Sequence, residues 1–267
     1  MLNFICFGSG SSGNCYYLFT EKEGILIDAG IGARTLKKYF GNYGLSMQNI
    51  RAILVTHDHA DHIKSVGAVS TDYCLPVYAT LDVHRGIERN FCVRKKVGAG
   101  CERYITCGVN YKVGGFEFVA FKVPHDSTDN VGFCIKHGEI TFCLITDAGK
   151  ITEEMRKYIQ EANYLVIEAN YEYEKLMMGT YPQHLKDRIT SGNGHLSNKE
   201  CGIALAENAT EKLKQVWLCH LSEENNHPEL ARKTVEYQLQ HFGIIPGKDF
   251  LLEVLRRKTP SEVCHLE

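Results

Sequence analysis

The sequence predicts an α+β fold in which two β-sheets pack face to face and helices cover them on the outside. Three observations indicate this class: short apolar runs separated by turn residues, a few longer helical segments between them, and polar residues that follow the strands. One-sided apolar sheets and helices must bury their apolar faces against one another. Since no Pro-, Gly- or Ser-rich linker divides the chain, we expect a single four-layer αββα domain over residues 1–267.

The expected elements follow in order along the chain. Short apolar runs bounded by turn residues indicate strands, at residues 4–7, 15–19, 24–28, 52–56, 76–79, 109–113, 116–123, 131–136, 140–145, 164–168 and 216–219. Helices are expected at residues 33–40, 81–90, 152–161, 197–214 and 228–242. Gly138-Glu139 indicates a hairpin turn, and Ser197 followed by Glu200 is a capping-box signature. The final Leu266-Glu267 is expected to lie outside the fold.

The composition limits the class of protein. Hydrophobic residues make up 44% and charged residues 23%, as in an ordinary globular domain. No apolar run approaches the roughly 18 residues that a membrane span needs, and the N-terminus lacks the basic region of a secretory signal. The eleven cysteines are scattered without any C-x-x-C pair. This pattern favours free thiols in a reducing cytoplasm over a disulfide framework or a zinc ribbon.

The net charge of −2 gives no global indication of a nucleic-acid partner, but one segment is basic. Residues 85–103 contain six Lys or Arg residues and two Glu residues. Such a segment can contact phosphates. It can equally be the solvated face of a helix followed by a loop, and the sequence leaves both interpretations open.

Six consecutive residues, His57-Asp58-His59-Ala60-Asp61-His62, follow the apolar strand expected at 52–56. Neutral imidazole is the commonest metal ligand in proteins, and carboxylates complete sites for first-row metals. His57 and His59 can hold one ion from a tight turn, whereas Asp61 and His62 are displaced enough to reach a second. A solvated loop with a chance run of histidines is the less favoured interpretation.

Three further strands are also followed by residues with metal-ligand chemistry. His125 comes after residues 121–124, Asp147 after 141–146 and His220 after 216–219. Each of these residues alone would be more simply explained as a structural one. Four strand ends with metal-ligand chemistry together favour a metal centre.

This order of residues resembles the metallo-β-lactamase superfamily, whose signature is H-x-H-x-D-H, then a His, a bridging Asp and a final His, each at a strand end. The resemblance covers about residues 2–255. It implies two divalent ions, one held by His57, His59 and His125, the other by Asp61, His62 and His220, with Asp147 bridging them. It also implies that Asp28 orients the histidine turn without binding metal. Zn²⁺ or Mn²⁺ suits these donors, and two such ions lower the pKa of a shared water to give a hydroxide nucleophile.

The segment Gly8–Asn14 resembles the S-G-S-S-G-N loop of the YycJ/WalJ-like branch of nucleases. Such a loop can form an anion nest for a phosphate, with Ser9, Ser11, Ser12 and Asn14 as candidate substrate-binding residues. The same residues also make an ordinary turn.

Two more residues resemble motifs of ribonuclease Z. Glu168 ends a strand in a segment similar to H-E-A-T, although Ile167 replaces the histidine, and His195-Leu196-Ser197 resembles H-S-T. The resemblance implies that His195 protonates a departing 3′ oxygen while Glu168 tunes it. Asp61 is the candidate base. A strand-end glutamate and a helix-start histidine also have ordinary structural explanations.

The YycJ/WalJ-like resemblance implies a 5′→3′ exonuclease that acts on DNA. The cysteine pattern predicts a cytoplasmic location, and the lack of a long apolar run predicts no membrane partner. Residues 174–194 are expected to form a mobile loop on the substrate side. Two alternatives stay open. A glyoxalase II-like thioesterase would use the same ligands but would not need His195, and a non-enzymatic regulator would keep the metals for structure alone.

Overall fold

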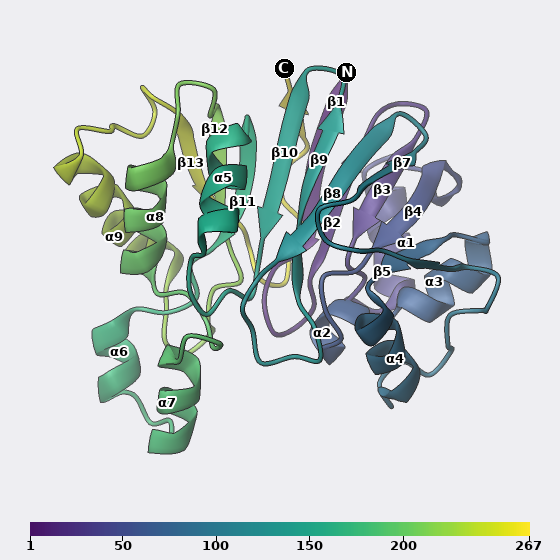
Figure 1. The fold of residues 1–267 in the computed structure, drawn as a ribbon, viewed down its shortest axis with the longest axis horizontal. Helices are drawn as coiled ribbons and strands as arrows, with labels where there is room; N and C mark the ends of the chain where they lie inside the picture. Colours follow the sequence, from purple (N-terminus) through teal and green to yellow (C-terminus); the bar gives the residue numbers. More distant parts are fainter. The chain divides into compact units, whose positions relative to one another are not determined.

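A computed structural model describes residues 1–267, and the chain divides into two compact units. The first contains Met1–Ala120, Ser127–Asn130 and Arg256–Glu267, and the second contains Phe121–Asp126 and Val131–Leu255. The strands form two mixed sheets (Figure 1). The prediction of a single domain over residues 1–267 stays a prediction.

The first unit contains a mixed sheet with the strand order β14-β1-β2-β3-β4-β5-β6. Its strands are β1 (Leu2–Gly8), β2 (Cys15–Phe19), β3 (Gly24–Ile27), β4 (Ile50–Leu54), β5 (Val77–Ala79), β6 (Glu102–Tyr104) and β14 (Cys264–Leu266). Strands β3, β4, β5 and β6 are parallel to one another, so their carboxyl ends meet at one edge of the sheet. Strands β7 (Asn110–Val113) and β8 (Phe116–Lys122) pair as an antiparallel hairpin of the second sheet, and the last two residues of β8 belong to the second unit.

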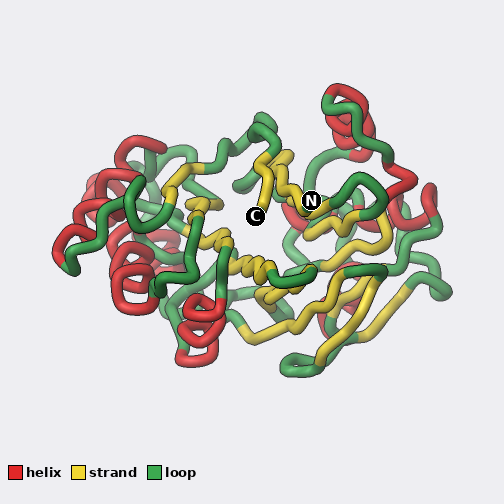
Figure 2. Tube along the Cα trace, turned by 90° about the horizontal axis from the view of Figure 1, so that it is seen from above, coloured by secondary structure: helices red, strands yellow, loops and turns green.

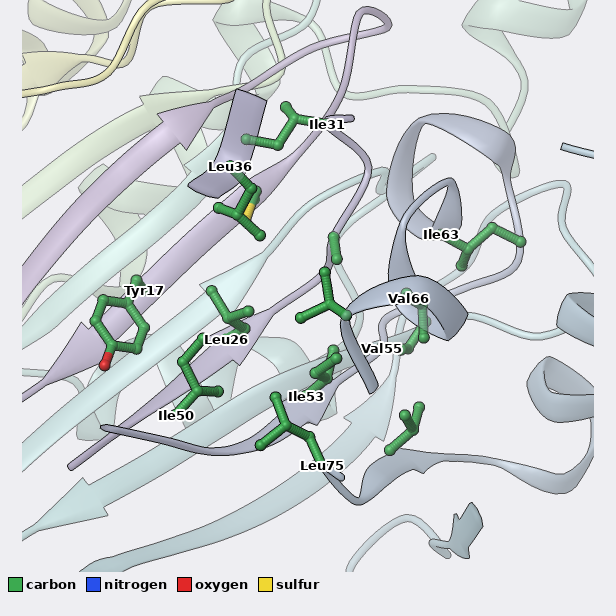
Figure 3. Close-up of a cluster of buried hydrophobic side chains, with 14 of the residues drawn as sticks. Tyr17, Leu26, Ile31, Leu36, Ile50, Ile53, Val55, Ile63, Val66 and Leu75 are labelled. Atoms are coloured by element: carbon green, nitrogen blue, oxygen red, sulfur yellow. The ribbon is translucent and has the colours of Figure 1, made fainter. Parts of the chain in front are cut away.

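Helices of the first unit cover this sheet and complete its core. They are α1 (Ala33–Asn42), the 3₁₀-helix η1 (Met47–Asn49), α2 (Ala60–Ile63), α3 (Val66–Tyr73) and α4 (Leu81–Arg89). Leu26 and Ile53 of the sheet belong to the same buried cluster as Ile63 and Val66 of the helices (Figure 3). This packing fixes the edge at which β3 and β4 end.

The second unit contains β9 (Val131–His137), β10 (Ile140–Ile145), β11 (Tyr164–Glu168), β12 (Gln215–Cys219) and β13 (Leu251–Val254). Strands β9 and β10 form an antiparallel hairpin, and β10 to β13 are parallel in sequence order. Its helices are α5 (Glu153–Glu161), α6 (Tyr173–Met178), α7 (Gln183–Thr190), α8 (Asn198–Asn208) and α9 (Pro228–His241). Helices α5, α8 and α9 lie beside the strands (Figure 1), and Figure 2 shows helices beside strands in a view turned by 90°. Because β10, β11 and β12 pair in parallel, their carboxyl ends share one edge.

Three sequence-based expectations were wrong. The helix expected at 197–214 ends at Asn208, because the chain needs residues 209–214 to turn into β12. The segment 174–194 is not an irregular loop, since it holds most of α6 and all of α7, and Lys186 donates to the Met177 carbonyl at 2.6 Å. Leu266 is part of the fold, because it is buried in β14 and pairs with Leu2 of β1.

The cysteines are placed as the sequence predicts. All eleven cysteines are free thiols. Cys134, Cys143 and Cys219 are buried within strands, as expected for small core residues. No helix combines the length and the apolar character needed to cross a membrane.

The capping box at the start of α8 is present and gives a testable stability effect. The Ser197 hydroxyl accepts from the Glu200 amide at 3.2 Å, and the Glu200 carboxylate accepts from the Ser197 amide at 3.0 Å. We expect Ser197→Ala to lower the free energy of unfolding by about 1 kcal/mol, because it removes an N-cap. Urea unfolding measures this, with the exposed Ser11→Ala as the control; equal stabilities for the two variants would contradict it.

Candidate metal centre

Three predicted site residues leave their strands in the left-handed backbone region. Asp28 follows β3 with φ 59°, Asp147 follows β10 with φ 54°, and His220 follows β12 with φ 53°. A side chain makes this region costly, so such residues persist only where the surroundings hold them. Strained backbone of this kind is typical of functional positions, so it points to these strand ends as the candidate site of each unit.

In the first unit, the predicted histidine cluster lies at the start of a short helix. His59 is the N-cap of α2, and Asp61 and His62 lie within that helix. The His57 ring centroid lies 4.7 Å from that of His59 and 4.1 Å from that of His62. His57 and His62 are fully buried. Three imidazoles this close, with the Asp61 carboxylate beside them, form a donor set for a divalent cation.

Asp28 connects this cluster to β3 by hydrogen bonds to Thr56 and His62. Its Oδ1 accepts from the Thr56 amide at 2.8 Å, and its Oδ2 accepts from the Thr56 hydroxyl at 2.8 Å. The same Oδ2 lies 2.7 Å from His62 Nδ1. A carboxylate on Nδ1 fixes the ring and leaves Nε2 as the metal-binding atom. The orienting role that the resemblance implied for Asp28 stays a prediction, and these contacts are the ones that it requires.

The glycine-serine loop is divided between buried and exposed side chains. Asn14 Nδ2 lies 2.8 Å from His62 Nε2 and donates to Asp61 Oδ2 at 3.2 Å. Ser9 is fully buried, with its hydroxyl 3.0 Å from that of Tyr16, whereas Ser11 and Ser12 are exposed. Asn14 thus lies against the ligand residues, with its amide at the Nε2 atom of His62 that a metal ion would use. The substrate-binding role of the four residues stays a prediction.

Gly30 gives the chain room to pass the cluster. A Cβ at this position would lie 1.6 Å from the Asp61 carbonyl oxygen and 2.8 Å from the Asn14 amide nitrogen. We expect Gly30→Ala to displace the Asp61 backbone, lower metal affinity about 10- to 100-fold and destabilise the fold by roughly 1–3 kcal/mol. Competition with a metal-sensitive dye and thermal unfolding measure the two effects.

Gly41→Ala is the matched control for this prediction. A Cβ there meets nothing within 4 Å, and the residue lies within α1. Alanine is the better helix former, so this variant should keep its metal affinity and gain up to about 1 kcal/mol of stability. Equal metal affinity in both variants would show that Gly30 does not shape the cluster.

In the second unit, three histidines surround one oxygen of Asp147. Asp147 Oδ1 lies 3.5 Å from His220 Nε2, 3.7 Å from His125 Nε2 and 3.7 Å from His195 Nδ1. Its other oxygen accepts from the Thr146 hydroxyl at 2.8 Å. The carboxylate is almost fully buried. The residues predicted from three separate strand ends therefore come together within this unit.

Glu168 lies behind these rings with both oxygens engaged. Oε1 lies 2.8 Å from His195 Nδ1 and 3.2 Å from His220 Nδ1, and Oε2 accepts the amides of Ala148 and Leu196 at 2.8 and 3.0 Å. Burial opposes ionisation of Glu168, but the neighbouring His195 and His220 outweigh it and lower the pKa of this carboxyl. Glu168 is thus a carboxylate that orients two imidazoles.

The histidines of this cluster differ in their electrostatics. Burial alone would lower the pKa of His195, but the carboxylates of Glu168 and then Asp147 raise it above its ordinary value. Burial lowers the pKa of His125, as suits a neutral ligand. The His195 side chain is 20% exposed, against 1% for His125 and 5% for His220. His195 is therefore the ring best placed to donate a proton to a substrate.

Comparisons with known proteins agree with this geometry. A β-lactamase superfamily domain matches residues 24–220. Exodeoxyribonuclease YycJ of Bacillus anthracis is 33% identical over 265 residues, covering 99% of each chain. The chain belongs to the YycJ/WalJ family of the β-lactamase superfamily. Exodeoxyribonuclease WalJ of Streptococcus pneumoniae is 34% identical and covers 91% of this chain and 90% of its own.

The solved structures confirm the predicted fold class. The metallo-β-lactamase fold protein YhfI of Bacillus subtilis superposes with a TM-score of 0.71 at 17% identity, covering 98% of this chain and 100% of its own. The α+β fold with two mixed sheets flanked by helices is therefore the one expected of a YycJ/WalJ-family protein.

The residues of this YycJ/WalJ-family chain suit divalent metals. Each cluster offers imidazole and carboxylate donors and no thiolate, which fits a first-row divalent cation. Within the second unit, ligand atoms of Asp147, Glu168, His195 and His220 all lie within 4.8 Å of one another. Because Glu168 is saturated by its two rings and two amides, Asp147 and His220 are the better ligands of this group.

Two supporting residues were not predicted from the sequence. Thr56 connects Asp28 to the cluster, and its hydroxyl also lies 3.0 Å from His57 Nδ1. Asn170 donates to the His220 carbonyl at 2.7 Å, which steadies the strained backbone there. The sequence could have indicated both from their positions, because Thr56 directly precedes His57 and Asn170 comes two positions after Glu168.

Proposed function

We propose that this chain is a metal-dependent exodeoxyribonuclease that removes nucleotides from DNA in the 5′→3′ direction. The observation that carries this proposal is the Glu168–His195 pair beside Asp147, since it sets a proton donor next to a ligand carboxylate. Cleavage of a phosphodiester needs such a donor, because an alkoxide is a poor leaving group. The names of the YycJ and WalJ relatives support the choice of DNA.

The proposal includes two divalent ions, Zn²⁺ or Mn²⁺. The order of the ligands in the sequence supports His57, His59 and His125 for one ion and Asp61, His62 and His220 for the other, with Asp147 shared. When bound, such ions lower the pKa of a coordinated water and stabilise negative charge on phosphate oxygens.

The chain's own residues perform the proton transfers. Asp61 accepts the proton of the attacking water. His195, held through Nδ1 by Glu168, donates from Nε2 to the departing 3′ oxygen. Asp28 holds His62 through Nδ1, and Asn170 holds His220, so the rings keep their orientation during turnover. The exposed Ser11 and Ser12 contact the phosphate of the substrate.

The proposed compartment is the cytoplasm. The eleven free thiols, six of them buried, support a reducing environment.

The test is a panel of substrates given to the Mn²⁺-loaded protein: end-labelled single- and double-stranded DNA, the matching RNAs, and a glutathione thioester. We expect degradation of DNA and no thioester hydrolysis. Hydrolysis of the thioester without cleavage of any nucleic acid would instead support the thioesterase alternative. An Asp61→Asn variant that keeps both its metal and its cellular function would support the alternative of a non-enzymatic regulator.

A further inference from the structure

The loop after α4 exposes an aromatic ring between two basic side chains. Phe91 is 90% exposed, the highest value of any large hydrophobic residue in the chain. Arg89, the last residue of α4, and Arg94, on the loop itself, are also exposed. A phenylalanine exposed to this degree offers the face of its ring to a stacking partner.

The loop is held in this shape by its own contacts. Asn90 Oδ1 accepts from the Cys92 amide at 3.0 Å, and Val93 next to it is buried. Lys96 Nζ donates to the carbonyls of Ile87 and Asn90 at 3.1 and 2.8 Å, which closes the end of α4. The exposure of Phe91 is therefore built into the fold of this segment.

The same loop is attached to the histidine cluster. Asn90 Nδ2 donates to the Asp58 carbonyl at 3.0 Å, and Asp58 stands between His57 and His59. Helix α4 also packs there, since a Cβ at Gly86 would lie 2.0 Å from Asp58 Oδ2. Whatever binds the loop is thus placed next to the candidate metal ligands of the first unit.

The charges of the basic segment are not equivalent. Four of its six basic side chains have partners within the chain: Arg85 pairs with Asp82, Lys95 with Asp72, Lys96 with two carbonyls, and Arg103 with the carbonyls of Gly100 and Glu102. Arg89 and Arg94 make no ion pair. The two unpaired guanidinium groups are the ones that flank Phe91.

We propose that Arg89, Phe91 and Arg94 form a platform for single-stranded DNA, on which a base stacks on Phe91 and the two arginines contact neighbouring phosphates. An aromatic ring between cationic side chains is the arrangement that binds single strands without sequence preference. The inference rests on the proposed function for the identity of the polymer. It gives the basic segment a defined role, that of guiding the strand toward the metal cluster.

The platform is tested by the affinity of metal-stripped protein for a labelled oligothymidylate at several salt concentrations. Phe91→Ala should weaken binding about 5- to 150-fold, the effect of one lost base stack, and Phe91→Trp should restore it. Arg89→Gln and Arg94→Gln should each reduce the salt dependence, log affinity against log salt, by about 0.7. Phe242→Ala and Arg34→Gln, which change an exposed phenylalanine and an exposed arginine elsewhere, are the matched controls and should change neither.

Two further readouts separate this inference from the proposed function. All variants should hydrolyse bis(p-nitrophenyl) phosphate like the wild type, because that ester is too small to reach the platform, while the KM for long DNA rises in Phe91→Ala. DNA cleavage with unchanged affinity and KM in the variants would overturn the platform and leave the nuclease. Phe91-dependent binding of the oligonucleotide without any DNA cleavage would overturn the nuclease and leave the platform.

Other partners for Phe91 would also be revealed. Undetectable binding of the oligonucleotide by the wild type contradicts the platform. The platform is also contradicted if Phe91→Ala keeps its affinity for DNA but loses affinity for anionic phospholipid vesicles. The same holds if Phe91→Ala keeps its affinity for DNA but changes its oligomeric mass in sedimentation.

Discussion

Asp147→Asn should abolish metal-dependent cleavage of DNA, with a fall in turnover of at least about 10³-fold, equivalent to roughly 4 kcal/mol. Asp147 Oδ1 is the atom that His125, His195 and His220 all approach. Removing its charge takes away the proposed shared ligand and the anionic centre of that cluster. Asparagine keeps the size of the side chain and tolerates left-handed backbone, so the fold should persist.

The measurement pairs initial rates on labelled DNA with metal content determined by elemental analysis. We expect fewer bound ions in Asp147→Asn together with a native circular dichroism spectrum. Asp72→Asn is the control, because Asp72 pairs with Lys37 and Lys95 at the surface, where ion pairs contribute little. Full metal content and near-normal turnover in Asp147→Asn would rule out the proposed bridging role.

His195→Ala should slow DNA cleavage about 10²- to 10⁴-fold without loss of metal, because a general acid contributes that much to breaking a bond to a poor leaving group. The residue is the most exposed of the three histidines near Asp147 and is oriented by Glu168 through Nδ1. Glu168→Gln should show a smaller loss in the same direction, since the ring loses its anionic partner.

The leaving group separates this role from metal binding. Nitrophenolate departs without protonation, so His195→Ala should hydrolyse bis(p-nitrophenyl) phosphate within about tenfold of the wild type. His184→Ala, an exposed histidine of α7, should behave as the wild type on both substrates. If His195→Ala lost equal activity on both substrates together with a metal ion, His195 would be a ligand and the proposed proton transfer would be wrong.

The strand-end residues could be predicted because parallel strands align their carboxyl ends. Glu168 pairs in register with Cys219, which places it directly beside His220. The same alignment brings together Asp147, Glu168 and His220 after the parallel strands β10, β11 and β12, whereas His125 follows β8, which is antiparallel to β7. The fold class followed from the same alternation of apolar runs and polar ends.

The rest depended on contacts that spacing does not encode. The contact between the Asn14 amide and His62, which lies 48 residues further on, depends on a tight turn that the loop's composition does not show. Helices α6 and α7 were missed because Tyr181-Pro182 and the glycines around them suggest a loop, while Lys186 and Leu176 bury themselves against their neighbours. The exposure of Phe91 could not be predicted, since a phenylalanine near a helix end is usually part of the core.

The central claim is tested most directly by the first product formed from 5′-labelled DNA with the Mn²⁺-loaded protein. We predict a labelled mononucleotide from the earliest time points, its loss after chelation of the metal, and its return when Mn²⁺ is added back. Label that stays on long fragments while the 3′ end shortens, or degradation that survives chelation in full, would contradict a metal-dependent 5′→3′ exodeoxyribonuclease.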